Sequence, residues 1–266
     1  KKGKSGTNKI SYTGEFTMRM KPSYSNFNIM NSQEQMDVYK NMEQNGSLSF
    51  VDSYRASQSG VYGKMYHLIN QYSATGGVFG LANTPEARGA YLKQAEFRNT
   101  DWFDLLFSNS ISQNHAVSMA TGTDKASYYT SISVMNDPGW TKRSKVQRYT
   151  ANINSTYNIF KNLTLNLIGN ASFRKQQAPG TLGSQADPVS GEVKRDFDIN
   201  PYSFALNTSR TLDPNEYYVR NYAPFNIFHE LDNNYMDLKV TDMRFQGEMK
   251  WKPIQKVELS ILGAYK

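Results

Sequence analysis

The sequence predicts an all-β chain: part of a transmembrane, antiparallel, up-and-down β-barrel whose extracellular loops contain helices. Three observations lead to this fold class. Polar and apolar residues alternate over runs of about ten residues, the length a tilted strand needs to cross a bilayer. The connections between these runs are alternately long and short. Aromatic residues make up 13% of the chain and end several of the runs, as in the interfacial girdles of membrane barrels.

The clearest run spans residues 9–21. Its apolar side chains fall on one face of an extended chain, and Lys9, Glu15 and Arg19 are among those on the other. A helix would scatter the same residues around its axis, so the alternation indicates a strand. The same pattern predicts further strands near residues 110–121, 126–135, 146–157, 163–173, 242–251 and 257–266, of which 110–121 is placed by its context.

The connections decide between two kinds of β-protein. Alternation alone is equally typical of a soluble sandwich or a lipocalin-like barrel. Here, however, the connections are long at 22–109 and 174–241, and short at 122–125 and 158–162 and around Pro253. Tight turns on one rim and long loops on the other are typical of outer-membrane barrels, which favours the membrane interpretation.

Parts of the long connections carry helix signals. Residues Ser32 to Gln35 resemble a capping box, and Thr84 followed by Pro85 is a second helix start, for a helix ending near Arg98. A third helix is predicted over residues 61–72. The segment 174–200, rich in Gly, Pro, Ser and Gln, is predicted to be an open loop.

Composition excludes several classes of protein. There is no cysteine, so disulfides and thiolate metal sites are excluded. No apolar run approaches the roughly 18 residues of a transmembrane helix. The formal net charge is +7, but the only dense basic cluster is Lys1, Lys2 and Lys4, so no nucleic-acid partner is expected.

Catalytic and metal chemistry find little support in the sequence. His67, His115 and His229 lie far apart without metal-ligand spacing, and we expect no metal and no cofactor. The pair His229–Glu230 beside Asp232 offers an acid and a base, but no recognised nucleophile or phosphate-binding motif accompanies it. We therefore predict no catalytic residues and no enzyme.

Aromatic residues in the long connections are the candidate ligand contacts. They are Trp102, Tyr217, Tyr218, Tyr222 and Phe225. Aromatic faces suit sugar rings and protein interfaces alike, and they also suit packing within the loop itself. Trp102, between Asp101 and Asp104, either joins a cation or sugar site or anchors its loop to the barrel rim.

Several local motifs carry a family resemblance. They are Lys1–Gly6 leading into a strand, Asn28–Ser32 with Glu34, Asn99–Asp104, His115 and Ser118, the hairpin Gly122–Tyr129, Pro138–Gly139, Arg148–Tyr149 and the Asn-rich strand Ala151–Tyr157. Together they resemble the SusC/RagA-like TonB-dependent transporters. The resemblance spans nearly the whole chain and is weakest from about residue 178 to residue 241.

The resemblance implies a function and a set of partners. Such a transporter has about 22 strands around a plug, and residues 1–266 match the N-terminal part of its barrel, with the plug domain absent. It implies a multi-pass protein of the cell outer membrane that imports large nutrients such as glycans or peptides. Its partners would be a SusD-like surface lipoprotein, TonB through the missing plug region, outer-membrane lipid, and oligosaccharide or peptide cargo. The alternative is a soluble or surface-exposed β-rich carbohydrate-binding module.

Overall fold

The chain forms two compact units. The computed structural model describes residues 6, 8–47, 60–179, 185–186, 193–194, 200–220 and 223–266. The first unit joins Lys1–Met20, Asn109–Ala178 and Met236–Lys266, and the second joins Lys21–Ser108 and Pro179–Tyr235. The first holds a large sheet, and the second holds the helices.

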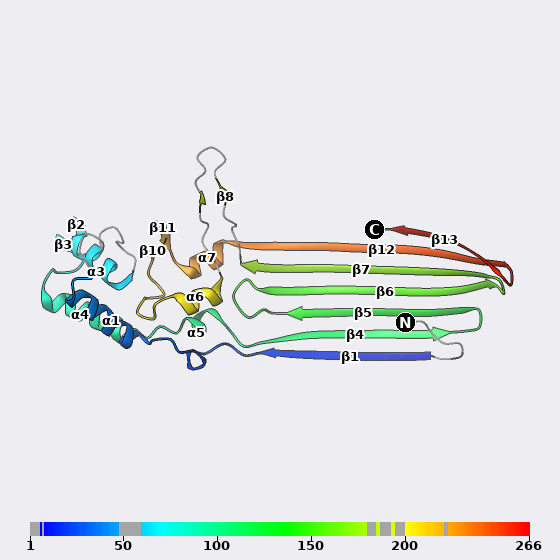
Figure 1. Ribbon diagram of the computed structural model, residues 1–266, viewed down its shortest axis with the longest axis horizontal. Coiled ribbons are helices and arrows are strands. Elements are labelled where there is room, and N and C mark those ends of the chain that lie inside the picture. Colours follow the sequence, from blue (N-terminus) through cyan, green and yellow to red (C-terminus); the bar gives the residue numbers. More distant parts are fainter. Residues whose placement is uncertain are drawn as a thin grey trace. The chain divides into compact units, whose positions relative to one another are not determined.

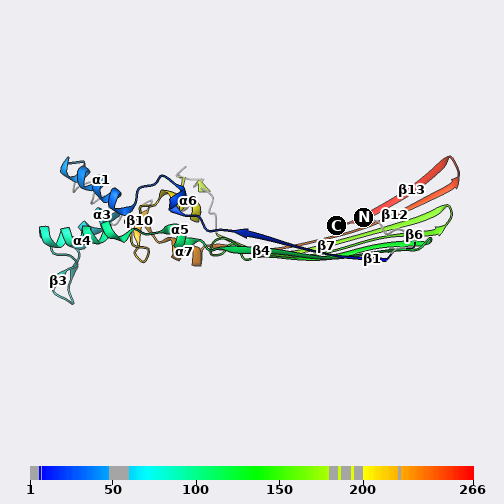
Figure 2. The same cartoon turned by 90° about the horizontal axis from the view of Figure 1, so that it is seen from below.

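The sheet is a seven-stranded meander in which neighbours in sequence are neighbours in space (Figure 1). Its strands, in order, are β1 (Asn8–Arg19), β4 (Ser110–Gly122), β5 (Ala126–Asp137), β6 (Lys145–Phe160), β7 (Leu163–Pro179), β12 (Tyr235–Ile254) and β13 (Val257–Tyr265). The pairing is antiparallel, as the sequence predicted. Figure 2 shows the sheet curving so that β13 rises away from the plane of β1 and β4. The sheet does not close into a barrel, since β1 and β13 are its two edges.

The register brings the apolar residues of successive strands into common rows. One row crosses five strands: Tyr12, Val117, Ile132, Ala151 and Ala171 are opposite one another in turn. A slip of one residue would move a whole strand's apolar set to the other face. The observed register therefore gives the sheet one apolar and one polar face.

Two strand ends differ from the prediction. The open loop predicted from residue 174 begins later, because β7 continues to Pro179. Likewise β12 begins at Tyr235 rather than near residue 242. From Arg174 to Gln177 of β7 the residues are polar on both faces, so the period-two pattern disappears there. The start of β12 does alternate, but Met236, Leu238 and Val240 lie on the face opposite to that of Met243 and Phe245, so the phase of the pattern changes within one strand. Alternation reports which solvent each face meets, and it says nothing where both faces are wet.

Short and long connections leave the sheet at opposite ends. Residues 123–125, 161–162 and 255–256 form the short turns at one end. The long connections, 20–109 and 180–234, leave from the other end and contain almost all of the second unit. Among the described residues, no helix is both long and apolar enough to cross a membrane.

The second unit has its own hydrophobic core. Its helices are η1 (Tyr24–Asn26), α1 (Ser32–Gln44), α3 (Gly60–Asn70), α4 (Pro85–Arg98), α5 (Trp102–Leu106), α6 (Pro201–Asn207) and α7 (Ile227–Asn233). Small two-stranded ribbons are formed by β2 (Tyr72–Ser73) with β3 (Val78–Phe79), β8 (Gln185–Ala186) with β9 (Val193–Lys194), and β10 (Tyr218–Arg220) with β11 (Ala223–Phe225). Met36, Val61 and Met65 pack at the centre of the cluster formed by α1, α3 and α4.

The helix starts were predicted well, with one shift. The side chain of Thr84 accepts a hydrogen bond from the Ala87 backbone at 3.2 Å, as expected for a cap. The capping box of α1 lies one residue earlier than predicted: Asn31 is the cap, and it exchanges 2.9 Å hydrogen bonds with Glu34. The hydroxyl of Ser32 instead donates to the Glu96 carbonyl at 2.6 Å, joining α1 to α4.

Candidate functional site

The apolar face of the sheet is exposed. Ile10 of the edge strand β1 retains 74% of its accessible surface, and Ile261 of the other edge strand, β13, retains 77%. Ile132 of the inner strand β5 still retains 58%. Among the described residues, every buried hydrophobic side chain belongs to the second unit. The apolar rows thus do not close over an interior of their own.

The opposite face of the sheet carries a polar network. Asn152 donates to the Ser131 hydroxyl at 3.2 Å, and Thr156 donates to the Asn166 amide oxygen at 2.9 Å. The Asn166 amide donates in turn to Glu248 at 3.1 Å, which links β7 to β12. Such a hydroxyl- and amide-rich surface suits contact with water and polar solutes.

An ion pair at the long-loop end ties β1 to β5 across β4. The Arg19 guanidinium donates to both oxygens of Asp137, at 3.2 and 2.9 Å. The Asp137 side chain is only 9% exposed, and it also accepts the backbone N–H of Gly139 at 2.9 Å. This bidentate arrangement orients the carboxylate and begins the turn toward β6.

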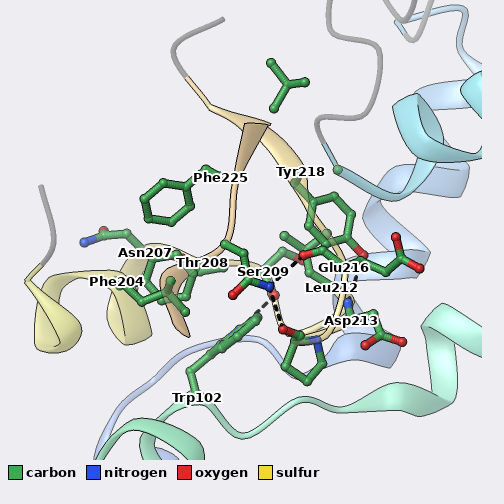
Figure 3. A pocket seen from close by; sticks show the side chains of 15 residues that line it. Trp102, Phe204, Asn207, Thr208, Ser209, Leu212, Asp213, Glu216, Tyr218 and Phe225 are labelled. Atoms are coloured by element: carbon green, nitrogen blue, oxygen red, sulfur yellow. Dashed lines mark hydrogen bonds between the residues drawn. The ribbon is translucent and has the colours of Figure 1, made fainter. Parts of the chain in front are cut away.

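An aromatic-walled pocket of about 290 Å³ lies in the second unit (Figure 3). Trp102, Phe204, Tyr218 and Phe225 supply its rings. The Trp102 indole N–H donates to the Ser209 carbonyl at 3.1 Å, and its ring meets Phe204 edge-on with centroids 5.1 Å apart. Phe204 in turn contacts Phe225, with ring centroids 5.8 Å apart.

The acidic residues of this pocket already have cationic partners. Glu216 pairs with Lys64 at 2.8 Å, and Asp213 lies 3.8 Å from Arg98. Burial raises the pKa of the Tyr218 hydroxyl, which accepts the Asp213 backbone N–H at 2.9 Å. The pocket therefore presents mainly aromatic surface, with its charges neutralised locally.

The structure brings together three of the five predicted contact residues. Trp102, Tyr218 and Phe225 line the pocket, although Trp102 and Phe225 are 3% and 5% exposed and serve the packing of the unit as well. Tyr217 is half-exposed beside the His229 ring and is not part of the lining. Tyr222 lies outside the described residues. A ligand role for these residues stays a prediction.

Sequence reasoning missed the second wall of the pocket. Phe204 and Asn207 come from α6, a helix that was not predicted. Its signal is the dipeptide Asn200–Pro201, in which Asn200 accepts hydrogen bonds from Tyr202 and Ser203 and the proline occupies the first turn.

The histidines have local structural partners. His115 contacts the Tyr12 hydroxyl at 2.7 Å and packs edge-on against Phe16. His229 lies on α7, where the Asn233 amide donates to its carbonyl at 2.8 Å. In the part of the chain that the structure describes, no three His, Asp or Glu residues cluster in a way that would hold a metal ion.

Comparison with known proteins gives matches to TonB-dependent receptors. No protein-family model matches the sequence. The chain is 32% identical over 149 residues to TonB-dependent receptor P26 of Formosa agariphila, covering 48% of this chain and 15% of that protein. It is 36% identical over 63 residues to TonB-dependent receptor SusC of Bacteroides thetaiotaomicron, covering 24% of this chain and 6% of that protein. This chain resembles the SusC/RagA-like TonB-dependent transporters.

Solved structures share the fold of this SusC/RagA-like chain. The RagAB peptide importer in its closed-closed state superposes with a TM-score of 0.63 at 14% identity, over 99% of this chain and 28% of that one. A second structure of the RagAB peptide transporter gives a TM-score of 0.64 with the same coverage. The chain thus spans about 28% of these structures and at most 15% of the curated relatives.

Proposed function

We propose that this chain forms part of the barrel wall of an outer-membrane TonB-dependent importer of large nutrients, glycans or peptides. The observation that carries the proposal is the exposed apolar face of the sheet, backed by a polar face. Hydrocarbon on one side and a watery lumen on the other would satisfy both faces at once.

The size of the apolar face supports a lipid environment. Seven strands at ~4.8 Å spacing are about 34 Å wide. From Tyr149 to Tyr157, the outer residues of β6 span about 26 Å along the strand. At the roughly 40° tilt of barrel strands this corresponds to a height of about 20 Å, which fits within the ~25 Å apolar band of membrane barrels. The resulting face, roughly 900 Å², exceeds the few hundred Å² that soluble monomers commonly expose.

The names of the relatives support a set of partners. SusC is named as a TonB-dependent receptor, and RagAB as a peptide importer. We infer that this protein works with a SusD-like surface lipoprotein on its long-loop side and receives energy from TonB through a plug. Peptides or oligosaccharides would pass along the polar face. No catalytic step is needed for this function.

Fractionation tests the membrane setting. The full-length protein that carries this chain should sediment with outer membranes and require detergent to stay dispersed. Its deletion should abolish uptake of a peptide or oligosaccharide that is too large for passive pores. Full recovery in the aqueous fraction without detergent would instead support the carbohydrate-binding module and refute the importer.

A further inference from the structure

Three lysines gather on the apolar face of the sheet, at the end from which the long connections leave. In the register of β6 and β7, Lys145 is opposite Gln177, and Gln147 is opposite Lys175. The Gln177 amide donates to Asp237 of β12 at 2.9 Å. Because β7 and β12 are antiparallel neighbours, Lys239 lies beside Lys175. These side chains line a pocket of about 260 Å³, called here the lysine pocket.

The lysine pocket carries unbalanced positive charge. Lys145, Lys175 and Lys239 are all exposed, and none of them forms an ion pair within the described ranges. The single carboxylate lining the pocket, Asp237, accepts the Gln177 amide. Like charges on adjacent strand positions repel each other. An anion among the three ammonium groups would remove this repulsion, and the amide groups of Gln147 and Gln177 supply further donors.

The neighbouring row determines what kind of anion fits. Next to the lysine pocket, on the same face, Tyr149 is opposite Phe173, and their side chains are 47% and 42% exposed. Beyond this aromatic pair the apolar rows begin, with Ala151 opposite Ala171 and then Ile153 opposite Gly169. Positive charge thus borders a hydrocarbon-compatible surface at the level where aromatic residues mark a membrane interface.

We propose that the lysine pocket binds the phosphate headgroup of an anionic membrane lipid whose acyl chains lie along the apolar face. This inference rests on the proposed barrel function, since it needs the apolar face to be in lipid. A soluble phosphate would use the lysines alone, whereas a lipid would use both the charge and the adjacent apolar rows. The site lies at the rim from which the long connections leave, which in an outer-membrane barrel is the outer leaflet.

A lipid titration with a matched control tests the proposal. The full-length protein in detergent is titrated with a short-chain phosphatidic acid, with the corresponding phosphatidylcholine and with inorganic phosphate. The triple variant Lys145→Gln/Lys175→Gln/Lys239→Gln is compared with Lys125→Gln/Lys161→Gln/Lys256→Gln, which removes the same charge from the short turns at the opposite end. Basic residues at a membrane surface contribute about 1 kcal/mol each, so the first variant should bind phosphatidic acid on the order of 100-fold more weakly.

The expected result is preference for phosphatidic acid over phosphatidylcholine and phosphate, lost in the first variant and kept in the control. Restoring charge with Lys→Arg at the same three positions should recover binding. Equal weakening in both Gln variants, or equal binding of inorganic phosphate, would overturn the proposal. A protein that stays dispersed without detergent would refute the barrel function itself. A detergent-dependent protein without this lipid preference would refute only the lysine pocket.

Discussion

The middle of β6 offers a direct measure of which solvent the apolar face meets. Ile153 is 52% exposed and lies midway between Tyr149 and Tyr157 on that face. It is opposite Thr130 on one side and Gly169 on the other, so a long side chain has room to extend outward. We predict that Ile153→Arg strongly destabilises the protein.

The expected loss of folding free energy follows from the depth of residue 153 in the apolar band. Tyr149 and Tyr157 are each four residues from Ile153, about 13 Å along the strand, which places Ile153 near the midplane of the apolar band. Arginine on the lipid face at the midplane costs about 2–4 kcal/mol, equivalent to a roughly 30- to 700-fold shift in the folding equilibrium. An exposed residue in water would tolerate the same change within about 0.5 kcal/mol.

Urea-induced unfolding of the full-length protein in lipid vesicles, followed by tryptophan fluorescence, measures this difference. The control is Asn154→Arg, one residue further along the strand, where the side chain belongs to the polar face. The control should lose less than about 0.5 kcal/mol. If Ile153→Arg were as mild as Asn154→Arg, the apolar face would not be in hydrocarbon, and the reasoning from exposure to lipid contact would fail.

Three further predictions concern a helix cap, a turn glycine and two buried tyrosines. Asn31→Ala should lower the stability of the helical unit by about 1 kcal/mol, because the Glu34 backbone N–H loses the Asn31 side-chain oxygen that accepts its hydrogen bond; thermal unfolding measures this. Gly139→Ala should cost at least about 1 kcal/mol in urea unfolding, because φ is +83° and a Cβ would collide with the Ser144 carbonyl oxygen. Burial raises the pKa of Tyr24 and of Tyr91 to about 12. Their neutral forms therefore stabilise the folded state below the ordinary tyrosine pKa of about 10, and that contribution should be lost as the pH rises toward 12, measured by tyrosinate absorbance and helical circular dichroism.

Each of these has a contrary outcome. Ser32→Ala is the control for the cap: it removes the hydrogen bond from Ser32 to the Glu96 carbonyl and leaves the cap hydrogen bond of Asn31 in place. A negligible effect of Asn31→Ala would show that Asn31 is not the cap of α1. Gly89→Ala is the glycine control: it lies in α4 with open space around it and should stabilise by roughly 0.5–1 kcal/mol. A Gly139→Ala variant as stable as the native chain would contradict the close approach of Ser144 to this turn. Ionisation of Tyr24 and Tyr91 with the ordinary midpoint at about pH 10 would contradict their burial.

Sequence reasoning succeeded where a local rule suffices. Period-two runs such as the one from Lys9 identified the strands and their two faces, because side chains of an extended chain alternate by geometry. Thr84 with Pro85 identified the start of α4, because a cap and its proline act within one turn. It failed at the end of β7, where polar residues on both faces leave no alternation to detect, and at the start of β12, where the apolar residues change from one face to the other.

The pocket depended on contacts between distant segments. Trp102 reaches the carbonyl of Ser209, more than a hundred residues later, and Phe204 joins it from a helix too short to show a clear period. The aromatic composition of the loops indicated that rings would gather, but not which ones would be buried.

The sequence by itself determined the class of fold, the two-faced strands and the rim that carries the long connections. These follow from periodicity and spacing, which are properties of neighbouring residues. Only the tertiary structure decided that the apolar rows are exposed across every strand, and that Lys145, Lys175 and Lys239 meet beside an aromatic pair. Register and strand pairing set those distances, and they depend on the hydrogen-bonded partner strand, which no local stretch of sequence specifies.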